Sequence, residues 1–212
     1  MKHINKIRHF TLVEIMTVIV IAAILFAIGI PAFSTMIQGN NMTVAVRQLS
    51  AKIQAARAYA VTNRCKVAVV FATNNVKDDY CYSAYRVCIV NDSEDGNKKV
   101  KVFQEWIADE NWKTLPKGVL RKDTTASYPN NVTIDASDIG GSTTTSFNAL
   151  VFDKKGQMES SGTINLCQGR YLSGSSHYTE RSAEGKVIVQ PIEINQYTGK
   201  IKTKEITLED PT

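Results

Sequence analysis

An apolar run at residues 10–33 constrains this chain more than any other feature of its sequence. Residues 15–33 are 19 residues without a charge, and as a helix they would extend about 28 Å, close to the hydrocarbon thickness of a bilayer. The one charge within residues 10–33 is Glu14. A carboxylate inside a membrane segment costs roughly 2.5–3.5 kcal/mol on insertion scales. The sequence therefore predicts a membrane helix whose single carboxylate has a partner and a function.

The residues before this run set its orientation. Lys2, Lys6 and Arg8 precede it, so the positive-inside rule places the N-terminus in the cytoplasm and the following domain outside the cytoplasmic face. A secretory signal peptide is one alternative, but Pro31-Ala32-Phe33 is a poor small-residue cleavage site. A plain single-pass anchor is the other alternative, and it does not explain Glu14.

Charge and motifs exclude several function classes. Without the three leader cations, 22 Lys and Arg residues stand against 20 Asp and Glu residues, so net charge predicts no polyanion partner. The sequence has no phosphate-binding loop and no zinc-protease or hydrolase motif, and we expect no enzyme, cofactor or metal. A catalytic triad around His177 is the enzymatic alternative, but residues 174–179 favour an exposed polar loop. A calcium loop starting at Asn91 fails because position 102 is Val102, where a bidentate Glu is required.

The chain contains four cysteines and no C-x-x-C pair, which disfavours zinc or thioredoxin-like chemistry. In an exported domain we expect one or two disulfides, with three pairings open. Buried free thiols are the alternative. The four cysteines are Cys65, Cys81, Cys88 and Cys167.

Beyond the apolar run, two different periodicities follow. Apolar residues recur at steps of three and four over residues 42–60, which predicts an amphipathic helix ending near residues 62–63. Pro31 favours a kink or local melting before it. From Cys65 the pattern changes to strands. We predict strands at residues 66–71, 84–90, 99–107, 132–134, 146–152, 162–166, 186–194 and 200–208.

The N-terminal residues carry a family resemblance. A short basic leader, then Phe10-Thr11-Leu12-Val13-Glu14, an apolar stretch and Pro31 resemble the signature of type IV prepilins and type II secretion pseudopilins. An ordered series of weaker motifs follows and narrows the resemblance to the GspH/FimT family of minor pilins and pseudopilins. These motifs are Leu115-Pro-Lys-Gly-Val119, Val151-Phe-Asp-Lys-Lys-Gly156, Gly162-Thr-Ile-Asn-Leu166 and Thr198-Gly-Lys-Ile-Lys202.

The resemblance implies an α+β, pilin-like fold in which one long N-terminal helix packs on a domain of two antiparallel sheets. It divides the chain into a cleaved leader (1–9), a transmembrane and assembly helix (10–34), an amphipathic helical half (35–64) and a β-rich domain (65–212) with a polar insertion around 121–146. It implies a minor subunit that assembles into, or primes, a pilus or secretion pseudopilus, with other pilin subunits, a prepilin peptidase and the inner membrane as partners.

The same resemblance assigns roles to single residues. The peptidase would cut between His9 and Phe10 and N-methylate Phe10, whose amine would then meet Glu14 of a neighbouring subunit and neutralise it in the filament. His9 departs from the family, which almost always has Gly there. We still predict cleavage at this bond.

The residues of the predicted C-terminal hairpin suggest an alternative function. Gln196-Tyr-Thr-Gly199 predicts a turn with a positive φ at Gly199, and Lys200, Lys202 and Lys204 follow on one face of a strand. Some members of the family bind DNA here through G-R-x-R, and this chain keeps the charge while losing the forked Arg geometry. DNA binding in natural transformation is therefore the alternative function. An edge strand protected from aggregation by Lys is the structural interpretation, and we prefer it.

Overall fold

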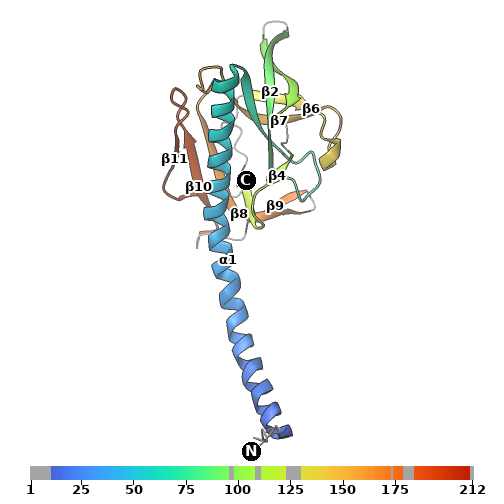
Figure 1. Ribbon diagram of the computed structural model, residues 1–212, viewed down its shortest axis with the longest axis vertical. Helices are drawn as coiled ribbons and strands as arrows, with labels where there is room; N and C mark the ends of the chain where they lie inside the picture. Colours follow the sequence, from blue (N-terminus) through green and yellow to red (C-terminus); the bar gives the residue numbers. More distant parts are fainter. Residues whose placement is uncertain are drawn as a thin grey trace, which may run out of the picture. The chain divides into compact units, whose positions relative to one another are not determined.

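The protein is described by a computed structural model that covers residues 11–95, 98–107, 111–122, 130–172, 174–178 and 184–210. The chain divides into two compact units, Met1–Asn40 and Asn41–Thr212. In the first unit the described backbone has one element, the beginning of helix α1 (Leu12–Asn63), which continues into the second unit (Figure 1). Helical backbone passes through Pro31 without a break, so the local melting that we predicted there is wrong. Among the described residues, no helix is both long and apolar enough to cross a membrane.

In the second unit, α1 buries one apolar stripe. Leu49, Ile53, Ala56 and Ala60 are at most 2 % exposed and contact the large core cluster that also contains residues of both sheets. The spacing of three and four residues puts them on one face of the helix. The helix ends at Asn63, at the position that the periodicity predicted.

The first sheet closes on itself as a small barrel. Its strands are β1 (Lys66–Phe71), β2 (Ala84–Asp95), β3 (Lys98–Trp106), β4 (Lys113–Thr114), β6 (Asn130–Ile134) and β7 (Thr145–Phe152). The order is β1-β7-β6-β3-β2-β4, and β1 also pairs with β2, so five strands form a ring. One side of β1 faces α1 through Val67 and Val69, and the other faces the barrel interior through Ala68 and Val70. This double burial explains why β1 reads as a continuous apolar run.

The second sheet has the order β11-β10-β8-β5. Its strands are β5 (Val119–Lys122), β8 (Gly162–Leu172), β10 (Val187–Ile194) and β11 (Ile201–Thr203), with β12 (Thr207–Glu209) on β10 and β9 (Ser175–Tyr178) on β8. A short 3-10 helix, η1 (Ser137–Ile139), lies between β6 and β7. Ile164, Leu166, Ile192 and Ile194 join the core cluster under α1.

The predicted α+β fold, a long helix on a domain of two sheets, is confirmed. One pairing departs from the antiparallel expectation, because β3 and β6 pair in parallel. The stretch at 121–146, expected as a polar insertion, supplies the end of β5, the barrel strand β6 and the start of β7, while 123–129 lie outside the described residues. The polar loop predicted at 174–179 is wrong for Ser175–Tyr178, which form β9.

Two of the motifs that carried the resemblance form tight turns against the end of α1. Gly156 and Gly199 have φ values of +75° and +61°, which residues with a Cβ rarely adopt. Arg57 of α1 donates a hydrogen bond from Nε to the carbonyl oxygen of Gly156 at 2.9 Å. A Cβ added at Gly199 would lie 2.5 Å from both Cδ and Nε of Arg57, so another residue in this turn would displace the Arg57 side chain in addition to straining the backbone.

Candidate assembly site

Glu14 lies in the first turn of α1. Its backbone N–H donates to Oγ1 of Thr11 at 3.2 Å, and this side-chain cap satisfies one of the free donors at the helix start. The hydroxyl of Thr17 in turn donates to the carbonyl oxygen of Glu14 at 2.9 Å. A negatively charged side chain in the first turn complements the positive end of the helix dipole. Glu14 is thus presented at a helix start as an exposed anion.

The helix surface around Glu14 is apolar and exposed. Leu12, Val13 and Met16 are 75 %, 67 % and 59 % exposed, and the pattern continues along the helix to Phe26 at 67 %. A contiguous apolar surface of this kind marks a contact with a protein or a membrane. The processing residues His9 and Phe10 lie outside the described residues, as does the side chain of Pro31.

The C-terminal hairpin has the predicted turn but not a continuous basic face. Asn195 accepts backbone hydrogen bonds from Tyr197 and Thr198 on Oδ1, and Gly199 has the expected positive φ. Lys202 on β11 lies directly across from Glu193 on β10, and the Nζ of Lys204 is 3.1 Å from the same carboxylate. Lys200 precedes the strand.

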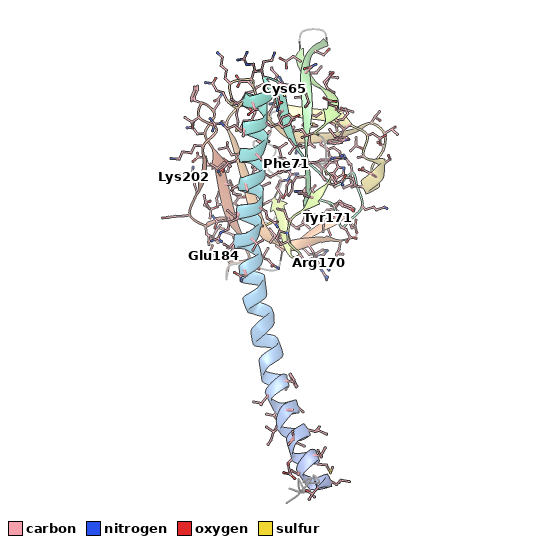
Figure 2. The ribbon with its side chains drawn as sticks, viewed as in Figure 1. Cys65, Phe71, Arg170, Tyr171, Glu184 and Lys202 are labelled. Carbon is pink, nitrogen blue, oxygen red and sulfur yellow. The ribbon has the colours of Figure 1, made fainter. Side chains whose placement is uncertain are left out.

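Glu193 therefore offsets part of the charge of the three lysines. β11 is also the end of its sheet, as the edge-strand interpretation requires, and Figure 2 shows Lys202 on this outer strand.

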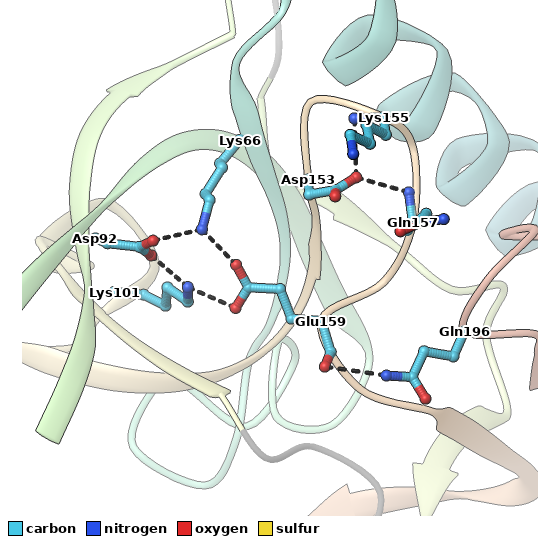
Figure 3. A network of polar contacts seen from close by, with 8 residues as sticks. All are labelled: Lys66, Asp92, Lys101, Asp153, Lys155, Gln157, Glu159 and Gln196. Carbon is cyan, nitrogen blue, oxygen red and sulfur yellow. Dashed lines mark hydrogen bonds and ion pairs between the residues drawn. The ribbon is translucent and has the colours of Figure 1, made fainter.

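A network of four charged side chains was not predicted from the sequence. Lys66 contacts Asp92 at 2.5 Å and Glu159 at 2.6 Å, and Lys101 contacts Asp92 and Glu159 (Figure 3). The side chain of Lys101 is 6 % exposed, so both carboxylates are needed to compensate its burial. The network joins β1, β2 and β3 to the segment before β8. Asp92 belongs to the stretch considered for calcium, and it binds two lysines.

The contacts in this network shift the pKa values of Asp92 and Lys66 in opposite directions. Hydrogen bonds from Lys101 and Lys66 lower the pKa of Asp92 to about 2. Burial by itself would lower the pKa of Lys66, but hydrogen bonds to Asp92 and Glu159 outweigh it and raise that pKa. The charged forms of both Asp92 and Lys66 are thus stabilised, which indicates a structural ion-pair network.

The disulfides expected from export are not formed in the structure, where all four cysteines are free. Cys81, Cys88 and Cys167 are buried, and Cys65 is half-buried at the end of α1 (Figure 2). Burial raises the pKa of Cys88 and of Cys167 to about 12, so these thiols are protonated and pack as small apolar side chains. The alternative that we kept open, buried free thiols, describes Cys81, Cys88 and Cys167 in this structure.

His177 contacts no carboxylate among the interactions found for the described residues. Its Nε2 lies 3.2 Å from Oγ of Ser175, and both residues are in the exposed region of the β8–β9 hairpin. In addition, no group of three or more His, Cys, Asp or Glu side chains in the described part of the chain could hold a metal ion.

A long helix packed through its second half on two sheets defines the chain as a pilin-like α+β protein. The model of the family described as "Type II transport protein GspH" matches residues 45–184. The chain belongs to this GspH family and is a minor pilin or pseudopilin.

Solved structures of two similar proteins have low sequence identity to the chain. The type IV minor pilin FimU of Pseudomonas aeruginosa PAO1 is 15 % identical, with 78 % of this chain and 90 % of FimU covered and a TM-score of 0.44. The minor pseudopilin EpsH from the type 2 secretion system of Vibrio cholerae is 10 % identical, with 76 % and 94 % covered and a TM-score of 0.41. No curated protein matches the sequence.

Proposed function

We propose that the protein assembles into, or primes, a type IV pilus or a type II secretion pseudopilus through the N-terminal part of α1. The observation that carries this proposal is Glu14, an exposed anion in the first turn of a helix whose neighbouring side chains are exposed and apolar. An anion in apolar surroundings is stabilised when it meets a cation that is also removed from water. After cleavage between His9 and Phe10, the amine of Phe10 in a neighbouring subunit supplies that cation.

Before assembly, the apolar segment holds the protein in the inner membrane. The sequence of residues 15–33 carries no charge, and the basic leader orients it with the β domain on the periplasmic side. A prepilin peptidase cuts the leader and N-methylates Phe10. The β domain then contacts other minor subunits.

Replacing Glu14 tests the proposal. In cells that assemble the filament, Glu14→Ala and the isosteric Glu14→Gln should both abolish incorporation, measured as the fraction of the protein in sheared or purified filaments. Glu205→Ala removes an exposed carboxylate elsewhere and should incorporate normally. Normal incorporation of both Glu14 variants would exclude the assembly role.

Processing has a separate measurement. The intact mass of the protein extracted from membranes should correspond to a chain that begins at Phe10 and carries one added methyl group. A chain that still begins at Met1 would mean that His9 blocks the peptidase and that the Phe10 amine is never formed.

DNA binding by the C-terminal hairpin is the second candidate. It is favoured by Lys200 and Lys202, which are exposed, and by Tyr197, which is 73 % exposed in the same turn and could stack on a base. Glu193 counts against it. Lys200→Glu with Lys202→Glu should reduce DNA retention and its salt dependence, whereas Lys113→Glu should not. Unchanged retention would eliminate this function.

A further inference from the structure

A groove runs beside the C-terminal end of α1, away from the strand face that carries Lys202. The floor and one wall are a face of the helix with Arg57, Ala58 and Val61. The other wall is formed by Lys200 in the turn and Ile201 at the start of β11. The groove has a volume of about 680 Å³ and is open to solvent. Val61 is 46 % exposed, so the floor offers aliphatic surface to a partner.

Arg57 and Lys200 line this groove, and three further cations lie on the segments that adjoin it. Arg57 and Arg64 come from the end of α1, Lys154 and Lys155 from the turn after β7, and Lys200 from the turn after β10. The turn after β7 lies against the groove, because a Cβ at Gly156 would be 2.7 Å from Cγ2 of Val61. We call these five residues the rim cations.

Three carboxylates near the rim cations have hydrogen-bond or ion-pair partners, whereas the exposed Glu105 lies, like Lys154, close enough to Cys65 to act on it electrostatically. Oδ1 of Asp153 accepts the backbone N–H groups of Lys155 and Gln157, Glu159 binds Lys66 and Lys101, and Glu193 binds Lys204. Within the described residues, no rim cation makes an ion pair with a carboxylate. The groove therefore combines an aliphatic floor with cations that form no ion pair within the described residues.

We propose that this groove docks an acidic segment of another subunit of the same assembly, with an apolar side chain on the floor and carboxylates facing the rim cations. The inference rests on the proposed assembly function. Complementary charge gives such a contact its specificity and register, and the buried apolar side chain gives it affinity. A nucleic acid fits less well, because no aromatic ring lines the groove on which a base could stack.

Photo-crosslinking in cells that assemble the filament tests the docking. With benzoylphenylalanine in place of Ala58 in the full-length protein, we expect an adduct with a pilin or pseudopilin subunit at a segment containing Asp or Glu beside an apolar residue. Lys154→Glu with Lys200→Glu should reduce the adduct about tenfold, since like charges then oppose the segment. Lys113→Glu, an exposed lysine away from the groove, and benzoylphenylalanine in place of Val102 are the matched controls.

Three outcomes of this experiment would contradict the proposed docking. These outcomes are no protein adduct at Ala58, an adduct that survives both charge reversals, and an adduct that nuclease removes. Changing the crosslinked acidic residues to Lys should restore the adduct of the reversed variant, which separates a lost contact from a misfolded domain. Incorporation of Glu14→Ala, measured in parallel, distinguishes failure of this groove from failure of the assembly function.

Discussion

The guanidinium of Arg57 donates from Nε to the carbonyl oxygen of Gly156 at 2.9 Å and also lies where a Cβ of residue 199 would be. One side chain of α1 thereby holds the turn after β7 and the turn after β10 against the same end of the helix. The two turns also contact each other, since the backbone N–H of Met158 donates to the carbonyl oxygen of Gln196 at 2.8 Å.

Gly199→Ala should therefore lower the free energy of unfolding by more than the strain of a positive φ, which is about 1–2 kcal/mol. Gly118→Ala is the matched control, because Gly118 has a φ of +84° with no atom near its Cβ position. The difference between the two variants in urea unfolding measures the contact with Arg57. Combining Gly199→Ala with Arg57→Ala should remove most of that difference, and equal losses in the two single variants would contradict the contact.

Acid should weaken the domain through Asp92. Its pKa is about 2 in the folded protein and 3.8 in the unfolded reference, so the unfolded chain binds the proton first as pH falls. The stabilisation from this carboxylate is complete above about pH 4 and is lost as pH falls toward 2. Thermal unfolding between pH 5 and 2 should show a steeper loss for the natural protein than for Asp92→Asn.

Asp79→Asn, which removes an exposed carboxylate outside the network, should follow the natural protein. Parallel curves for all three proteins would show that the network does not stabilise the fold.

Some of the strands that the sequence predicted, β1 among them, have a burial that follows their apolar pattern. β1 has five buried residues out of six. β3 was predicted from its alternating sequence, but its burial is the reverse of its apolar pattern, because Val100 and Val102 are 37 % and 41 % exposed while Lys101 between them is buried. β5 was missed because Arg121 and Lys122 look like solvated residues, yet they are 3 % and 4 % exposed. Arg121 donates to the carbonyl oxygen of Ala72 and lies over the ring of Phe71. These contacts with residues distant in the sequence allow the basic residues of β5 to be buried, and a single sequence does not show them.

In the candidate sites, too, some residues could be predicted from the sequence and others could not. Glu14 could be predicted because an isolated charge in an apolar run is a local anomaly of the sequence. The rim cations could not, because they come from three segments whose proximity depends on the turns at Gly156 and Gly199. The sequence also could not show that the three lysines of the C-terminal hairpin do not form one continuous basic face. That depends on Glu193, which lies on the neighbouring strand opposite Lys202.

The cysteines should differ in how fast they react with a thiol reagent. Because burial raises the pKa of Cys88 and Cys167 to about 12, little thiolate forms at neutral pH. Iodoacetamide should modify the native protein first at the half-buried Cys65, and Cys88 and Cys167 should react only after unfolding, as peptide mass spectrometry can show. A non-reduced mass lower by two hydrogens per bridge would instead reveal disulfides.

Lys122 should anchor the last strand. Its Nζ is 3.1 Å from Oε2 of Glu209 and also contacts the carbonyl oxygen of Asp210, while Oε1 of Glu209 accepts from Asn165 at 2.9 Å. Lys122→Ala leaves the carboxylate without its buried cation, and we expect a loss of about 3–5 kcal/mol in the free energy of unfolding.

Lys122→Met combined with Glu209→Gln removes both charges and keeps the volume, so it should be closer to the natural protein in urea unfolding than Lys122→Ala. Hydrogen exchange should show the first loss of protection in β12, because its pairing with β10 covers only three residue pairs and Lys122 no longer holds its Glu209. Unchanged exchange in β12 of the Lys122→Ala variant would mean that the backbone pairing alone holds this strand.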